Sequence, residues 1–203
     1  EKHHTPGGEC TGWDRQGYHI DGCIHWLVGT KEDAPLNRLW KKVGALECVD
    51  VYHPESFMTF EFEGVTVKLY RDLNRLRSSW LELSPQDRPV IEEFCKAIRT
   101  IQSYDIPADK PMDLMSLGEK VKMLMKMKDV GPTLQHRFAN KFQHPALRKA
   151  LSSLLPEGYS AVSIIFSLAA FTQDQASVPF GGSRAMAMRM KERYLSLGGS
   201  IET

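Results

Sequence analysis

Two glycine pairs, far apart in the sequence, are the residues best suited to hold a ligand. Gly7 and Gly8 follow Pro6, and Gly181 and Gly182 directly precede a predicted helix. Because glycine has no Cβ, the backbone at either pair could run close to a ribose, a pyrophosphate or a flat ring. At the second pair, the unpaired amides of a helix N-terminus would add hydrogen-bond donors for a flat or anionic cofactor. Each pair is also typical of an ordinary turn or helix start, and that interpretation stays open.

An acidic residue at the first position would complete the same kind of site. In dinucleotide-binding folds an acid at the end of the second strand accepts hydrogen bonds from the adenosine ribose, about 20 residues after a glycine-rich turn. Glu1 matches that acid if a strand, a glycine-rich turn and a helix precede it. We therefore expect one edge of a dinucleotide site, on an internal piece of a longer enzyme.

His25 is the candidate for proton transfer. An imidazole titrates near neutral pH, so it could donate a proton or orient a group beside a cofactor. It could equally be a structural histidine that is hydrogen-bonded under a turn. His19 and Cys23 lie close to His25 in sequence, but their spacing matches no zinc pattern, and the four cysteines form no CxxC pair. The sequence therefore predicts neither a metal site nor a disulfide framework.

Composition excludes several classes of function. The 203 residues carry 26 basic and 25 acidic side chains, a net charge of +1, so no bulk field would attract nucleic acid. The longest apolar run, at 164–171, is too short to span a bilayer. No signal peptide is visible, and we expect a cytoplasmic protein with reduced thiols.

Patterns in the first third and in the middle predict the elements that would position these residues. An extended stretch is expected at 17–21, a helix at 36–46, and a β-hairpin at 57–70 that turns at Glu63 and Gly64. From 72 to 155 the pattern is helical. Ser84 is the expected N-cap of one helix there, with Pro85 at its first position.

The remaining helices are predicted from the spacing of apolar residues and from the prolines and glycines that bound them. They are expected at 114–128, 133–141, 145–154 and 160–172, and the last begins with Ser183 as N-cap and stops at Gly198–Gly199. The fold class is therefore α+β, with a small mixed or antiparallel sheet and a large helical insertion, rather than a repeating βαβ domain.

A family resemblance rests on two groups of residues. The first is Glu1-Lys2, Pro6-Gly7-Gly8, Gly17-Tyr18, Asp21 and Ile24-His25-Trp26; the second is His144-Pro145, Leu147-Arg148, Pro179, Gly181-Gly182-Ser183, Leu197-Gly198-Gly199 and Ile201. Together they resemble the phytoene desaturase, carotenoid isomerase and retinol saturase group. The members of that group are FAD-dependent enzymes that act on long polyenes or related apolar molecules.

The resemblance implies a role for each candidate residue. The residues it would place near FAD are Glu1 at the adenosine ribose, Gly7 and Gly8 along the ribose and phosphates, and Gly181 and Gly182 at the flavin. His25 stands where retinol-saturase-like members have a histidine. Glu9 stands where relatives have an arginine, which removes one cationic contact to the cofactor.

The resemblance also implies a domain organisation. Residues 1–35 would form the FAD-contacting edge of the dinucleotide domain, 36–178 a substrate domain with its helical insertion at 72–155, and 179–203 a return to the FAD site. The family's glycine-rich turn and its C-terminal FAD-contacting segment are missing from the sequence. We therefore expect this piece alone neither to bind FAD tightly nor to turn over, and expect it to need the remainder of its own chain.

The expected activity is desaturation, saturation or isomerisation of a carbon–carbon bond in an apolar small-molecule substrate, with hydride exchanged through FAD. A flavin amine oxidase or protoporphyrinogen oxidase relative is one alternative, and a non-catalytic α+β interaction module is another. The methionines and lysines at 115–128 have two interpretations. They can form an adaptable apolar rim for peripheral contact with a membrane, or an ordinary helix core with solvated lysines.

Overall fold

The computed structural model describes residues 2, 4–103, 115–127, 135–156 and 158–202. The fold is α+β with small antiparallel sheets, which confirms the predicted class. The chain divides into two compact units, and each is described by itself. Unit 1 consists of residues 1–53 and 174–203, and unit 2 of residues 54–173.

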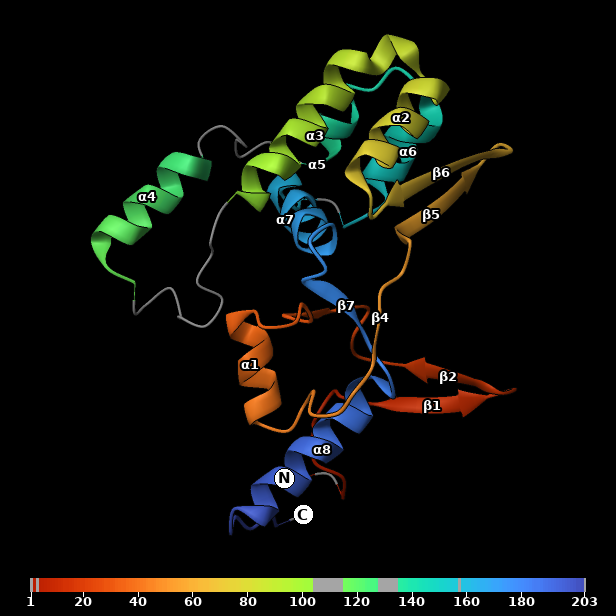
Figure 1. Cartoon of the computed structure of the whole chain (residues 1–203). Helices are drawn as coiled ribbons and strands as arrows, with labels where there is room; N and C mark the ends of the chain where they lie inside the picture. The colour runs from red at the N-terminus through yellow and green to blue at the C-terminus, as the bar shows by residue number, and fades with distance from the viewer. Residues whose placement is uncertain (1, 3, 104–114, 128–134, 157, 203) are drawn as a thin grey trace. The chain divides into compact units, whose positions relative to one another are not determined.

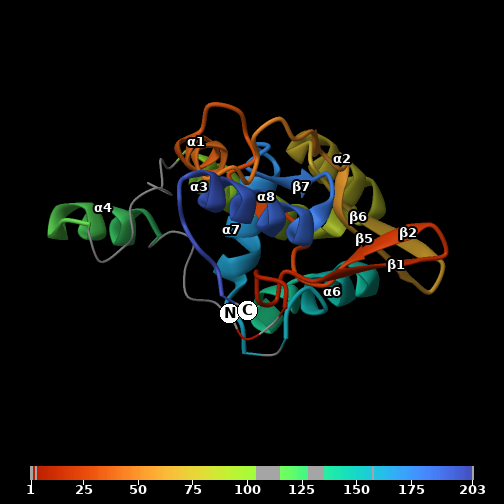
Figure 2. The same cartoon turned by 90° about the horizontal axis from the view of Figure 1, so that it is seen from below.

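Unit 1 contains a hairpin, a three-stranded sheet and two helices (Figure 1). Its elements are β1 (Gly12–Arg15), β2 (Tyr18–Asp21), β3 (Leu27–Val28), α1 (Pro35–Lys42), β4 (Val51–Tyr52), β7 (Ala176–Pro179) and α8 (Gly182–Ser196). β1 pairs antiparallel with β2, and β7 lies between β3 and β4, antiparallel to both. Helix α8 follows β7 in the chain and packs against the β1–β2 hairpin and against β7 (Figure 2).

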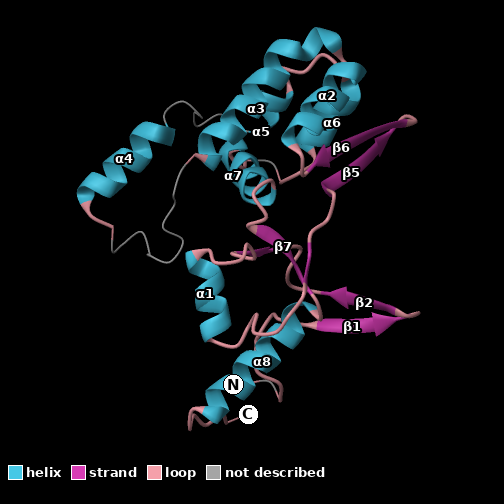
Figure 3. Ribbon diagram, viewed as in Figure 1, coloured by secondary structure: helices cyan, strands magenta, loops and turns pink. Residues whose placement is uncertain are grey.

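Unit 2 begins with the predicted hairpin and continues as a helical layer (Figure 3). Its elements are β5 (Ser56–Phe62), β6 (Val65–Tyr70), α2 (Leu73–Leu83), the 3₁₀ turn η1 (Pro85–Asp87), α3 (Arg88–Gln102), α4 (Leu117–Met127), α5 (Gln135–Ala139), α6 (Pro145–Ser152) and α7 (Ala161–Phe171). Glu63 and Gly64 both adopt left-handed backbone, with φ of 49° and 77°, as a two-residue hairpin turn requires.

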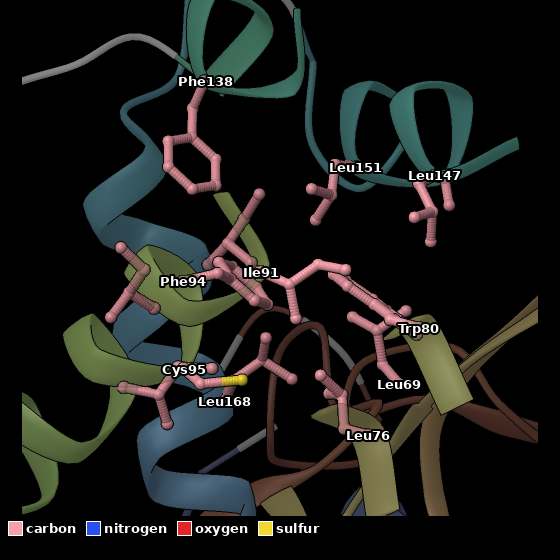
Figure 4. Close-up of a cluster of buried hydrophobic side chains, with 14 of the residues drawn as sticks. Leu69, Leu76, Trp80, Ile91, Phe94, Cys95, Phe138, Leu147, Leu151 and Leu168 are labelled. Carbon is pink, nitrogen blue, oxygen red and sulfur yellow. The ribbon is translucent and has the colours of Figure 1, made fainter. Parts of the chain in front are cut away.

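Apolar side chains from the hairpin and most of the helices form the core of unit 2 (Figure 4). Trp80 is its centre: the indole stacks on Phe94 at 5.4 Å and meets Phe142 edge-on at 5.9 Å. Its ring nitrogen donates to the carbonyl of Lys68 on β6, so the one polar atom of the side chain is also satisfied. Helix α2 is thereby fixed against the hairpin.

Ser84 precedes the helical run as predicted, with Pro85 at its first position, but the run opens as the 3₁₀ turn η1 and α3 itself begins at Arg88. The Ser84 hydroxyl makes no capping hydrogen bond and donates to Asp87 Oδ2 at 2.7 Å. The predicted start of α8 is wrong, since Ser183 is the second residue of that helix rather than its N-cap, which is Gly181 in left-handed backbone. The Asp21 carboxylate takes the place of a serine cap there, because its Oδ2 accepts the Ser183 N–H.

The compact units divide at other positions than the predicted domains. Residues 36–53 and 174–178, which the predicted substrate domain includes, lie in unit 1 with α1, β4 and β7. The parts of the predicted helices at 114, 128 and 133–134 lie outside the described residues. Within the described part of the chain, no helix combines the length and apolar character needed to cross a bilayer.

Candidate functional site

The second glycine pair, Gly181 and Gly182, lies at the start of α8, and this helix packs against the β1–β2 hairpin. Asp21, the last residue of β2, points its carboxylate at this helix start. Its Oδ2 accepts the backbone N–H of Ser183, and its Oδ1 accepts the Ser183 hydroxyl at 2.8 Å. Oδ1 also accepts the N–H groups of Cys23 at 2.8 Å and Ile24 at 3.0 Å. One carboxylate therefore ties the turn after β2 to a helix 162 residues away.

The same hydrogen bonds set the charge state of Asp21. Partial burial alone would raise the pKa of this carboxyl, but the hydrogen bonds from Ser183, Cys23 and Ile24 outweigh burial and hold the pKa below its ordinary value. Asp21 is therefore ionised at neutral pH. A negative charge at the first turn of a helix is stabilised by the unpaired amides there.

Three glycines allow the backbone to pack closely around α8. A Cβ at Gly182 would lie 2.3 Å from Asp21 Oδ2, and a Cβ at Gly7 would lie 2.9 Å from the Cβ of Ala187. A Cβ at Gly44 would lie 2.9 Å from that of Arg193. These contacts leave no room for a side chain, so close packing within unit 1 is sufficient to require glycine at all three positions.

Gly8 and Gly181 differ, because both are exposed. A Cβ at Gly8 would meet nothing within 4 Å, although φ there is +56°. Gly181, at φ +83°, would place a Cβ 2.8 Å from Ala185 and 3.9 Å from Nη1 of Arg189. At Gly8 the bare backbone faces open space and is accessible to a ligand, whereas a side chain at Gly181 would collide with Ala185.

Arg189 adds a charge beneath Gly181 that sequence patterns did not single out. Its Nε donates to the carbonyl of Ala45 at 3.0 Å, but Nη2 is buried and has no acceptor among the described residues. Burial lowers the pKa of Arg189, yet a guanidinium stays protonated in proteins. The result is a half-buried cation near the second glycine pair whose Nη2 is closed off from solvent.

The structure does not bring every predicted site residue together. Glu1 lies outside the described residues. Glu9 is exposed, and its carbonyl accepts the N–H of Thr11 at 2.7 Å. His25 is exposed, with its ring 5.9 Å from that of Trp26. His25 is therefore accessible to solvent, and a role in proton transfer stays a prediction.

The start of α8 does not suit the phosphate groups and the flat ring of an FAD molecule equally. A phosphate there would have to displace the Asp21 carboxylate, which already receives the Ser183 donors, so the anionic half of FAD does not fit at Gly182. A flat, neutral ring is compatible with Gly8, whose exposed backbone has open space beside it. The fit of the described residues to a flavin ring therefore rests on the backbone at Gly8.

Comparison with known proteins adds no family assignment. No known family model matches the chain, and no curated protein is significantly similar to it. Among the described residues, no three His, Cys, Asp or Glu side chains gather in a way that could hold a metal ion.

Replacing Gly7 by alanine is expected to destabilise unit 1 by about 2 kcal/mol, and replacing Gly8 by about 1 kcal/mol. Both changes force alanine into positive-φ backbone, but only the Cβ at position 7 meets a neighbour, Ala187. Urea denaturation of the two variants measures both free energies of unfolding. Equal losses would contradict the close contact of Gly7 with α8.

Proposed function

We propose that this chain contributes to an FAD-dependent oxidoreductase that acts on a carbon–carbon bond of an apolar, polyene- or lipid-like substrate. The observation that supports it best is the meeting of the two glycine pairs at one helix. Gly7 lies against α8 at Ala187, and Gly181 and Gly182 begin that helix. Segments from the two ends of the sequence thus form one surface, which is the arrangement expected for the edge of a flavin site.

In this proposal the chain's own residues bind and orient. The backbone at Gly8 holds the flat ring without interference from a side chain. Bound FAD would supply hydride exchange with the substrate. Asp21 keeps the α8 start in place and does not itself contact the cofactor.

Unit 2 is the proposed substrate side. Its helices have an apolar core of their own. On α4, Leu117, Val121 and Met125 are exposed and recur at every fourth residue. This stripe supports peripheral membrane contact by an otherwise cytoplasmic protein, in order to take up a lipid-like substrate.

A second candidate function is a non-catalytic interaction module. It is favoured by the Asp21 carboxylate at the α8 start and by the close packing at Gly7 and Gly182, because these explain three of the site features without a ligand. The two candidates differ in one measurable property. Only the first requires a bound flavin.

The test is flavin binding by the complete product of the gene that encodes this chain. We expect a flavin absorption spectrum in the purified protein, and about tenfold weaker FAD affinity in the Gly8→Ala variant, since its methyl group would occupy the open space beside the backbone. Gly64→Ala is the matched control. It places alanine in the same backbone region, also with nothing within 4 Å, in the turn between β5 and β6.

Two results would decide against the proposal. Absence of flavin from the complete product, with no FAD binding on titration, would favour the interaction module. Equal weakening by Gly8→Ala and Gly64→Ala would remove Gly8 from the site. Tight stoichiometric binding by the 203-residue chain alone would contradict its expected dependence on a glycine-rich turn.

A further inference from the structure

Two cysteines meet beside the Asp21 turn. The sulfur atoms of Cys10 and Cys23 are 4.0 Å apart, although thirteen positions separate the residues in sequence. Cys10 is half-buried and Cys23 is exposed, and both are free thiols. Neither takes part in the proposed flavin site.

The strand register accounts for their meeting. Gly12 pairs with Asp21 at the end of the β1–β2 ladder, and the N–H of Gly22 donates to the carbonyl of Thr11 at 2.8 Å, one position further on. Continued by one more residue, the same register places Cys10 opposite Cys23. The pair therefore follows from the hairpin itself and not from a chance contact between loops.

That position suits a covalent cross-link. The pair next to a hydrogen-bonded pair in an antiparallel ladder is a non-hydrogen-bonded one, with Cα atoms about 4.5 Å apart and side chains close together. A disulfide needs Cα atoms about 4.4–6.8 Å apart. At that Cα spacing, rotation of the two side chains would bring the sulfurs, 4.0 Å apart in the structure, into bonding distance.

We propose that Cys10 and Cys23 form a reversible intramolecular disulfide by exchange with a small-molecule disulfide of the glutathione class. The thiolate of exposed Cys23 attacks one sulfur of the small disulfide, whose S–S bond breaks and releases one small thiol. The thiolate of Cys10 then attacks Sγ of Cys23 and releases the second. The protein loses two electrons and two protons, and the small disulfide is reduced to two thiols.

The surroundings of Cys10 indicate which thiol reacts first. Burial, the contact with Cys23 and the negative charges of Asp21 and Glu9 all raise the pKa of Cys10. A thiol that stays protonated is a poor nucleophile, so Cys23 is the attacking group and Cys10 the resolving one. Exchange at Cys10 should accelerate as pH rises, since its thiolate fraction then increases.

The cross-link would act on the start of α8. Cys23 donates its N–H to Asp21, and Cys10 donates its N–H to the carbonyl of Gly7. A bond between the two side chains joins the turn that holds α8 to the glycine segment that packs against it. Oxidation is therefore expected to raise the thermal midpoint of unit 1, and reduction to return it.

The chain contains its own reference thiols. Cys95 is fully buried in unit 2, where burial raises its pKa to about 11, and Cys48 is exposed. Trypsin cleaves at Arg15, between Cys10 and Cys23, so a linked pair of peptides 3–15 and 16–31 identifies the proposed disulfide. Cys48 lies in a separate tryptic peptide, 43–68.

The test exposes the folded chain to glutathione buffers of increasing oxidation, quenches it with acid, alkylates the remaining thiols and maps the tryptic peptides by mass spectrometry. We expect the linked pair to appear at mildly oxidising ratios and to vanish on return to reduced glutathione. In the Cys10→Ser variant Cys23 should instead keep a glutathione adduct, and the oxidation-dependent shift of the thermal midpoint should be lost. Cys48→Ser is the control and should behave as the parent chain.

Three outcomes would overturn the proposal. The first is a stable glutathione adduct on Cys23 of the parent chain that never resolves to Cys10. The second is a predominant link from Cys48 to either cysteine or to a second copy of the chain. The third is an equal midpoint shift in Cys23→Ser, a variant at an exposed site that is expected to fold. Because none of these readouts involves flavin, they do not depend on the proposed function.

Discussion

Replacing Asp21 by alanine is expected to destabilise unit 1 by about 3 kcal/mol. The change removes the acceptor for three backbone N–H groups and for the Ser183 hydroxyl, and leaves the α8 start without a charge to balance its amides. Urea denaturation gives the free energy of unfolding, and hydrogen exchange should locate the loss of protection at 21–24 and 182–186. Asp14→Ala is the matched control, since Asp14 lies on the same hairpin with its side chain 81% exposed.

The pH dependence of this contribution has a definite sign. The pKa of Asp21 is lower in the folded chain than in the unfolded one, so its stabilisation is complete above the unfolded pKa, near 4, and is lost as pH falls further through the folded pKa. The Asp21→Asn variant should lack this component of acid lability. A parent chain and an Asn variant with identical stability profiles between pH 2 and pH 6 would contradict the role assigned to the ionised carboxylate.

Replacing Asp87 by alanine is expected to destabilise unit 2 by about 4 kcal/mol. Asp87 is 1% exposed, and its oxygens accept the N–H groups of Gln143 at 2.7 Å and His144 at 3.0 Å, and the hydroxyl of Ser84. Without the carboxylate these donors stay buried and unsatisfied. Hydrogen exchange at the amides around Trp80, in the core of unit 2, reports on this unit apart from the other.

A second aspartate in unit 2 provides the control for Asp87. Asp72 caps α2 by accepting the N–H groups of Asn74 and Arg75. Unlike Asp87, it is exposed, and its hydrogen bonds join residues that are already adjacent in sequence. Asp72→Ala should cost only about 1 kcal/mol. Burial raises the pKa of Asp87, but its hydrogen bonds lower it by more, so its contribution too should disappear as pH falls below about 4. Equal costs at positions 72 and 87 would contradict this account.

Sequence patterns predicted well those elements whose determinants are local. The hairpin at β5–β6 is specified by alternation and by a two-residue turn, and α7 by a nearly apolar stretch after Ser160, which caps it as serine commonly does. The error at Ser183 arises because a carboxylate from outside the helix takes the place of a local cap. For α8 that carboxylate is 162 residues away, and no local rule can identify it.

The candidate site was predictable in its glycines but not in its charges. The positions of Gly8 and Gly181 follow from sequence, whereas Asp21 and Arg189 acquire their surroundings only when β2 and α8 pack together. The cysteine pair was missed because cysteine spacing was compared only with local motifs. The signal that could have found it is the hairpin register, in which positions 10 and 23 face each other across the turn at Gln16–Gly17.

The place of β7 between β3 and β4 has a consequence for biosynthesis. The strands that it joins are translated before unit 2, whereas β7 and α8 are translated after it. Unit 2 is continuous, from 54 to 173, so it can fold while the first 53 residues still lack their central strand. During that interval the edges of β3 and β4 and the carboxylate of Asp21 have no native partner from the C-terminal segment. A nascent-chain arrest placed before residue 174 should therefore give a folded helical unit attached to a protease-sensitive N-terminal segment.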